Sequence, residues 1–285
     1  MPRLFLSAAL FAAAGSLALG ASGPDAAEIM ARVAQNQDRA VELRKMFVYQ
    51  QTARVRLLKT NGKLLWDETH EYDVTPTPTG SETKLLRVYG QRRKSGDFVT
   101  FDQEGKLEAD GLDPQLMESF HEDLTTQAGS RDGFSPDLFL LTSKEQKKYV
   151  FTLEGEEQQR GRKVYRLRFE PRGDRGSDGG GIWKGEALVD REEFQPVFVQ
   201  TQLALKIPLP IRLLFGISIR QIGFSVSYDR FGENVWFPVS YGGEFFLKLF
   251  HFYKRTVIVS MSSDRFRQTA VESDIRFEQP ATGHN

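Results

Sequence analysis

The sequence predicts a mainly β protein of the α+β class, in which about eleven antiparallel strands form a strongly curved sheet, or half-barrel. Three observations support this prediction. Apolar and polar residues alternate with a period of two through most of the chain, as in strands with one buried face. Short turns rather than helices join these runs, which favours antiparallel pairing. Helical spacing occurs near the start of the chain and in its middle, which predicts an N-terminal helix and a mid-chain helical lid.

The beginning of the chain has the pattern of a secretory signal peptide. Arg3 gives a positive start, residues 4–19 form an uncharged apolar stretch, and small residues follow. A membrane anchor is the alternative, but the stretch is shorter than the roughly 20 apolar residues that cross a bilayer. We therefore expect residues 1–22 to be a signal peptide. Residues 23–285 are expected to form a single exported domain, periplasmic or secreted, because no linker divides them.

A helix over residues 25–45 opens the expected domain, because Asp25 and Glu28 form a capping box and apolar residues follow at helical spacing. After this helix the period changes to two. Four strands are predicted before the middle of the chain, the first two joined by a hairpin turn at Asn61-Gly62. They lie at 47–57, 64–74, 85–89 and 98–101.

The middle of the chain predicts a second helix. Asp113 is placed as its cap and Pro114 in its first turn. A further short helical turn is expected from Ser135-Pro136. The apolar face of the second helix consists of Leu116, Met117, Phe120 and Leu124.

The second half of the chain is almost wholly β in character, interrupted by a glycine-rich loop at 171–181. Two strongly apolar segments, 203–216 and 245–253, admit two interpretations. Either they are core, as a strand running into a tight loop and as a strand buried on both faces, or they line a cavity or a lipid-facing rim. The strand candidates lie at 149–153, 165–169, 182–190, 197–205, 224–228, 257–259 and 271–277.

The composition argues against several classes of function. The 38 basic and 38 acidic side chains balance, so no overall positive field would draw the chain to nucleic acid or anionic lipid. Cysteine is absent, which excludes disulfides, thiolate metal sites and cysteine nucleophiles. We expect no catalytic residue, no cofactor and no metal.

The remaining polar motifs are weak signals for chemistry. Glu118 and His121 form an E-x-x-H pattern, which without a second carboxylate helix is more typical of a solvated helix face than of a metal site. The four histidines contain no pair at ligand spacing in the sequence. The acidic clusters at 154–157 and 190–193 are expected to be soluble hairpin tips. The alternative is the carboxylate pair of an envelope hydrolase, with Asp190 and Glu193 as its best version.

Two helices cannot fill the concave side of such a sheet, which predicts an apolar hollow covered by a mobile helical lid. The candidate ligand-binding residues come from the second helix and from two of the predicted strands. They are Leu116, Met117, Phe120, Leu124, Tyr165, Leu167, Phe169, Phe224, Val226 and Tyr228.

Several stretches also resemble a known family. Residues 46–50 (MFVYQ) open the first strand, residues 61–63 (NGK) form its turn, and residues 185–190 (GEALVD) lead through an acidic turn to residues 194–197 (FQPV). With the order of elements, these stretches resemble the LolA/LolB lipoprotein carriers and the related sensor RseB, an outer-membrane lipoprotein-sorting family. The resemblance implies a LolA-like fold for most of residues 23–285 and no catalytic residue.

We therefore expect a periplasmic binding or carrier protein, not an enzyme, that holds a lipid, an acyl chain or a lipoprotein in its apolar concavity. The alternative is an envelope sensor or assembly module whose sheet edge or apolar rim binds another envelope protein. A carboxylate-pair hydrolase is the third hypothesis. No nucleic-acid partner is expected, and no transmembrane span after cleavage of the signal peptide.

Overall fold

The computed structural model of this chain describes residues 23–77, 80–105, 107, 110–125, 140–172, 183–204, 220–232, 235–249 and 253–269. Several predicted features lie outside these residues. They are the expected signal peptide, the helical turn at Ser135-Pro136, most of the glycine-rich loop, most of the apolar segment 203–216 and the strand at 271–277.

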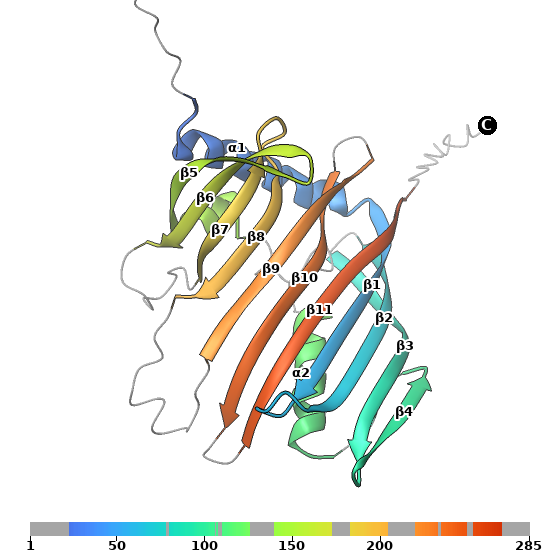
Figure 1. The fold of residues 1–285 in the computed structure, drawn as a ribbon. Helices are drawn as coiled ribbons and strands as arrows, with labels where there is room; N and C mark the ends of the chain where they lie inside the picture. The colour runs from blue at the N-terminus through green and yellow to red at the C-terminus, as the bar shows by residue number, and fades with distance from the viewer. Residues whose placement is uncertain are drawn as a thin grey trace, which may run out of the picture.

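Eleven antiparallel strands form one unclosed sheet in the described residues (Figure 1), which confirms the predicted fold class. β1 pairs with β11, so the first and last described strands are neighbours inside the sheet, while β4 and β5 form its two edges. The strand order is β4-β3-β2-β1-β11-β10-β9-β8-β7-β6-β5. The strands are β1 (Phe47–Leu58), β2 (Leu64–Thr77), β3 (Gly80–Lys94), β4 (Asp97–Gln103), β5 (Tyr149–Gln159), β6 (Arg162–Pro171), β7 (Trp183–Asp190), β8 (Pro196–Leu203), β9 (Arg220–Phe231), β10 (Val235–Leu249) and β11 (Tyr253–Gln268).

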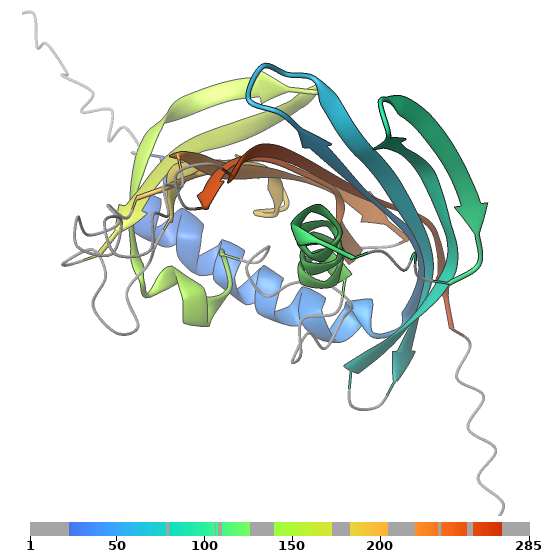
Figure 2. The same cartoon turned by 90° about the horizontal axis from the view of Figure 1, so that it is seen from below.

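The sheet curves strongly, and the helices lie on its concave side (Figure 2). They are α1 (Ala26–Arg44), α2 (Leu112–Thr125) and the short α3 (Ser143–Gln146). We call the concave side the inner face and the convex side the outer face. Among the described residues, none of these helices combines the length and the apolar character needed to cross a bilayer.

The strand β1 shows how the sequence alternation assigns the two faces. Ala53, Val55 and Leu57 are all 0% exposed and lie on the inner face. Arg54, between two of them, is exposed on the outer face. This period of two is the pattern that predicted the strand.

The helix α1 confirms the predicted start signal. Asp25 is its N-cap, and Asp25 Oδ1 accepts a 2.8 Å hydrogen bond from the backbone N–H of Glu28. Ile29 and Val33 on the buried side of the helix are both 0% exposed. The capping bond and the apolar side therefore determine where α1 begins and which way it faces.

Buried polar contacts fix α1 against the sheet. Gln37 Nε2 donates a 2.8 Å hydrogen bond to Gln195 Oε1, beside β8. Arg44 Nε donates a 3.0 Å hydrogen bond to the carbonyl oxygen of Trp236 in β10. Because such bonds lie away from water, breaking them is costly, so α1 is a fixed cover of the inner face.

Two groups of buried apolar side chains fill the inner face. The first core cluster packs Ile29 and Val33 of α1 against side chains of β6 to β10. The second core cluster packs Met117 of α2 against the inner faces of the central strands, including Val55 of β1 and Val257 of β11. Each helix therefore has its own part of the inner face.

The predicted cap of α2 is wrong by two positions. The helix begins at Leu112, and the backbone N–H of Gln115 donates to the carbonyl oxygen of Gly111 at 3.3 Å. Asp113 consequently lies in the first turn. Its carboxylate does not cap the helix because it binds side chains of β11, as described below.

The apolar segment 245–253 is not a single strand buried on both faces. It contains the end of β10 and the first residue of β11. The antiparallel register places Phe245 beside Val257, so the chain reverses between them. Phe245 and Leu247 are half-buried at the border of the second core cluster.

Candidate functional site

The inner face beneath α2 is the part of the fold that best matches the predicted lid and its floor. Met117 is 1% exposed and enters the second core cluster, whereas Leu116 and Phe120 are half-buried at its border. The Phe120 ring lies 5.3 Å from the ring of Phe245, measured between centroids. α2 therefore covers the centre of the sheet with one apolar side, as its helical spacing predicts.

A polar anchor holds the first turn of α2 against β11. Asp113 Oδ1 accepts hydrogen bonds from Tyr253 Oη at 2.5 Å and from Arg255 Nε at 2.8 Å. Asp113 Oδ2 accepts a third bond from Arg255 Nη2 at 3.1 Å. Burial and the Asp113 carboxylate raise the pKa of Tyr253, so its hydroxyl remains a donor. The negative charge in the first turn also complements the helix dipole.

A second polar group lies on the inner face of β2. His70 Nε2 and Glu68 Oε1 are 2.7 Å apart, and the other ring nitrogen of His70 lies 2.8 Å from Tyr72 Oη. Trp66 Nε1 donates a 3.0 Å hydrogen bond to Glu68 Oε2. All four side chains are buried. Their spacing of two along β2 places them on the same face of the sheet.

His121 of α2 lies directly over this group. Its ring is stacked on the ring of His70, with centroids 3.6 Å apart and planes inclined by 5°. His121 Nε2 is 3.5 Å from Glu68 Oε1. Burial, and secondarily the charge of His70, lower the pKa of His121 to about 2, so the ring is neutral at physiological pH.

The structure thus overturns the assignment of His121 to a solvated helix face, because this residue is 2% exposed. It also brings together two histidines that are distant in the sequence. The sequence of β2 contained one signal for this polar group, because Glu68 and His70 occupy the same alternating positions as the apolar residues Trp66 and Val74. The contribution from α2 had no such signal, because sequence spacing does not show which helix covers which strand.

The structure divides the predicted ligand-binding residues between the two core clusters. Leu116, Met117 and Phe120 belong to the second core cluster, and the side chain of Leu124 lies outside the described residues. The six strand residues belong to the first core cluster and are 0–5% exposed. They are Tyr165, Leu167, Phe169, Phe224, Val226 and Tyr228.

The inner face is accordingly packed with side chains in the described residues rather than open as an apolar hollow. Besides the apolar side of α1, Leu140 and Leu141 enter the first core cluster and are 4% and 2% exposed. The prediction of an open hollow counted helices and did not include these side chains before α3. An apolar ligand could reach this face only by displacing a cover, and α2 is the cover with half-buried apolar side chains at its border.

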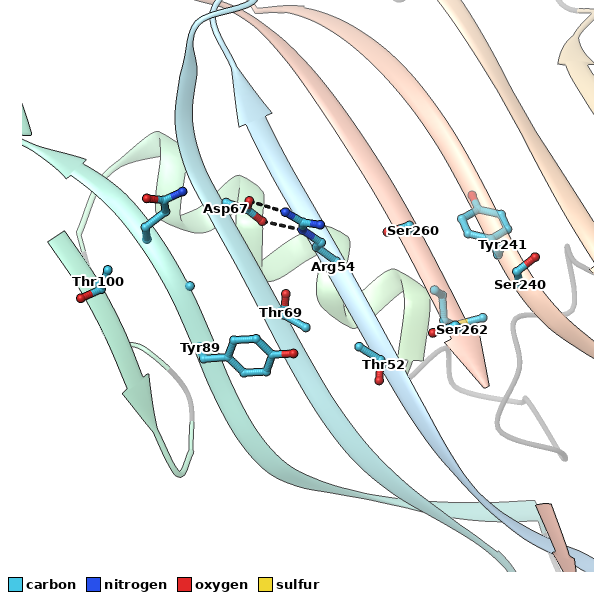
Figure 3. Close-up of a pocket in the computed structure, with 13 residues that line it drawn as sticks. Thr52, Arg54, Asp67, Thr69, Tyr89, Thr100, Ser240, Tyr241, Ser260 and Ser262 are labelled. Carbon is cyan, nitrogen blue, oxygen red and sulfur yellow. Dashed lines mark hydrogen bonds and ion pairs between the residues drawn. The ribbon is translucent and has the colours of Figure 1, made fainter. Parts of the chain in front are cut away.

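A separate hollow of about 680 Å³ lies on the outer face (Figure 3). A bidentate ion pair crosses it, with Arg54 Nε 2.8 Å from Asp67 Oδ1 and Arg54 Nη2 2.6 Å from Asp67 Oδ2. This hollow lies on the opposite face of the sheet from the helices, and none of the predicted ligand-binding residues lines it, so it is not the site that the sequence predicts. The hydroxyl side chains that line it are Thr52, Thr69, Tyr89, Thr100, Ser240, Ser260 and Ser262.

The acidic cluster after β7 forms structural contacts. Asp190 is 4% exposed, and its Oδ1 accepts hydrogen bonds from the backbone N–H groups of Glu192 and Glu193 at 2.9 and 2.8 Å. Asp190 Oδ2 lies 3.2 Å from Arg162 Nη1. Glu193 accepts a 3.0 Å bond from Trp236 Nε1. Asp190 is thus a buried turn cap and not a soluble hairpin tip, and these bonds give both carboxylates a structural role.

Comparison with solved structures shows proteins with a similar arrangement over most of this chain. A candidate outer membrane lipoprotein-sorting protein domain from Vibrio parahaemolyticus has a TM-score of 0.38 and 9% identity, covering 86% of this chain and 95% of its own. A LolA superfamily protein from Nitrosomonas europaea has a TM-score of 0.36 and 10% identity, covering 85% and 96%. MucB has a TM-score of 0.28 and 14% identity, covering 82% and 94%.

Two of these structures have names that belong to the family that the sequence resembles. No family model and no curated protein match the sequence.

Proposed function

We propose that this chain is an exported periplasmic binding or carrier protein that holds an acyl chain, as a lipid or as part of a lipoprotein, between α2 and the inner face. The observation that carries the proposal is the packing of α2. Its apolar side covers fully buried residues of the central strands, while Leu116, Phe120 and Phe245 at the border remain half-buried.

The ligand would replace the side chains of α2 on the second core cluster. Its floor contains Val55, Leu57, Val257 and Val259, which are 0–1% exposed and entirely aliphatic. Burying an acyl chain contributes about 0.8 kcal/mol per CH₂, so about eight carbons supply roughly 6 kcal/mol towards opening α2 and binding. Binding of the acyl chain therefore needs no polar motif.

The test is binding of a fluorescent fatty acid to delipidated protein, together with native mass spectrometry of the protein as purified from the periplasm. We expect one acyl ligand per chain. Phe245→Ser should weaken binding, because Phe245 borders the second core cluster. Phe98→Ser is the matched control, because Phe98 is 44% exposed on the edge strand β4. Apo protein that takes up no fatty acid, or equal binding by both variants, would contradict the proposal.

An envelope module that binds another protein through its sheet edge is the second candidate function. It is favoured by β4, the edge strand beside β3, where Phe98 and Val99 are 44% and 46% exposed. An exposed edge with apolar side chains is suited to pairing with a strand of a partner. Here the roles of the two variants reverse, since Phe98→Ser should abolish capture of a stoichiometric envelope partner and Phe245→Ser should not.

A further inference from the structure

Three side chains that commonly bind metals meet between β2 and α2. Glu68 and His70 lie on the inner face of β2, and His121 lies over them from α2. The ligand atoms that these residues offer all lie within 4.8 Å of one another. Glu68 Oε1 is 2.7 Å from His70 Nε2 and 3.5 Å from His121 Nε2.

These distances suit a zinc ion. Zinc binds histidine nitrogen and carboxylate oxygen at about 2.0–2.2 Å, which in a tetrahedral site separates two ligand atoms by about 3.3 Å. The 3.5 Å between Glu68 Oε1 and His121 Nε2 slightly exceeds that separation. The 2.7 Å between Glu68 Oε1 and His70 Nε2 is shorter than it. To admit the ion, His70 would move away from Glu68 by roughly half an ångström, and the two stacked rings would rotate out of their parallel planes so that a nitrogen of each points at the metal.

Neighbouring residues hold the metal-facing groups in place. Tyr72 Oη lies 2.8 Å from Nδ1 of His70, so Nε2 of His70 is the nitrogen that faces Glu68. Trp66 Nε1 donates to Oε2 of Glu68, which leaves Oε1 towards the two histidines. Metal-binding histidines and carboxylates usually have such hydrogen bonds on their second atom, because these bonds orient the ligand.

Burial of the cluster favours a cation within it. Glu68, His70 and His121 are 5%, 6% and 2% exposed. Within the part of the chain that the structure describes, the ion-pair partners of Glu68 are these two histidines and no lysine or arginine. A buried carboxylate is unfavourable unless its charge is compensated, and a divalent ion between Glu68 and the two histidines would compensate it more fully than the imidazoles do.

We propose that Glu68, His70 and His121 bind one Zn²⁺ ion that fastens α2 to the sheet. The set of two histidines and one carboxylate leaves a fourth position on zinc for water or another ligand. Because two ligands belong to β2 and the third to α2, binding of zinc joins the lid to its floor. The site does not depend on the binding of an acyl chain, and its test contains no lipid.

The experiment uses the full chain, stripped with a chelator, and measures zinc by elemental analysis and by competition with a chromophoric chelator. We expect one zinc per chain in the wild type. His121→Ala and Glu68→Gln should each lower the affinity by at least 100-fold, and Tyr72→Phe by about tenfold, because Tyr72 orients His70. Glu118→Gln is the matched control on the exposed side of α2 and should bind as the wild type does.

Two further measurements keep the result independent of any variant that fails to fold. Cobalt bound to the wild type should show the intense visible absorption of a tetrahedral site. Zinc should also slow hydrogen exchange in α2 of the wild type. A wild type without stoichiometric zinc, or His121→Ala with unchanged affinity, would overturn the proposal.

Discussion

The anchor at the start of α2 gives a quantitative prediction for Asp113→Asn. This change keeps the shape of the side chain and removes the charge that accepts three hydrogen bonds from Tyr253 and Arg255. The side chains of Arg255 and Asp113 are 20% and 29% exposed, so solvent weakens the pair. We expect docking of α2 to lose about 1–2 kcal/mol, within the range of charge-assisted hydrogen bonds.

If the ligand binds only when α2 has opened, weaker docking raises the apparent affinity. A loss of about 1.4 kcal/mol in the closed state increases the competent fraction, and hence the affinity, by about tenfold while the open state remains minor. The assay is titration with a fluorescent fatty acid, with hydrogen exchange of α2 measured on the same sample. Glu118→Gln removes one negative charge from the exposed side of the same helix and should change neither measurement.

The reasoning would be refuted if Asp113→Asn released α2, as shown by faster exchange, and left the affinity unchanged or lower. Unchanged exchange in α2 would instead refute the role of Asp113 as an anchor.

Two further predictions concern stability. Burial holds the pKa of His121 below that of an ordinary histidine, so below about pH 6.5 the unfolded chain binds more protons than the folded chain. The free energy of unfolding therefore decreases as the pH falls below that value. Between about pH 7 and 5 the wild type should lose roughly 2 kcal/mol of its free energy of unfolding, measured by urea unfolding in the presence of a chelator. An equal pH dependence in His121→Phe would contradict this prediction. The second prediction concerns Gly185 of β7, where a Cβ atom would collide with the carbonyl oxygen of Gln200 in β8. Gly185→Ala should therefore destabilise the fold by about 1–3 kcal/mol, whereas Gly242→Ala in β10, where the nearest atom to a Cβ would be 3.9 Å away, should not; equal melting temperatures for the two variants would show that β7 and β8 separate without cost.

Most of the sheet could be predicted from residue alternation because each strand has one buried face. The start of β10 could not, because Pro238, Gly242 and Gly243 interrupt the strand pattern. The structure accommodates the proline at a register shift between Pro238 and Ser240, where the ladder with β9 is irregular. The short α3 was missed because four residues are too few for helical periodicity, although Thr142 caps it.

The candidate site could be predicted only in part, because it combines elements that are far apart in the sequence. The apolar spacing of Leu116, Met117 and Phe120 correctly predicted which side of α2 is apolar. It did not indicate that His121, the next residue, would stack on His70 of β2. Partners across a fold depend on how a helix is placed over a sheet, and local patterns contain no information about that placement.

The central claim is that an acyl chain binds beneath α2 on the inner face, and photo-crosslinking with a diazirine-bearing fatty acid tests it most directly. After irradiation and peptide mapping, we expect the label on α2 near Met117 and on the facing segments of β1, β10 and β11. Labelling confined to the hydroxyl-lined hollow of the outer face, or to the edge strand β4, would contradict the claim.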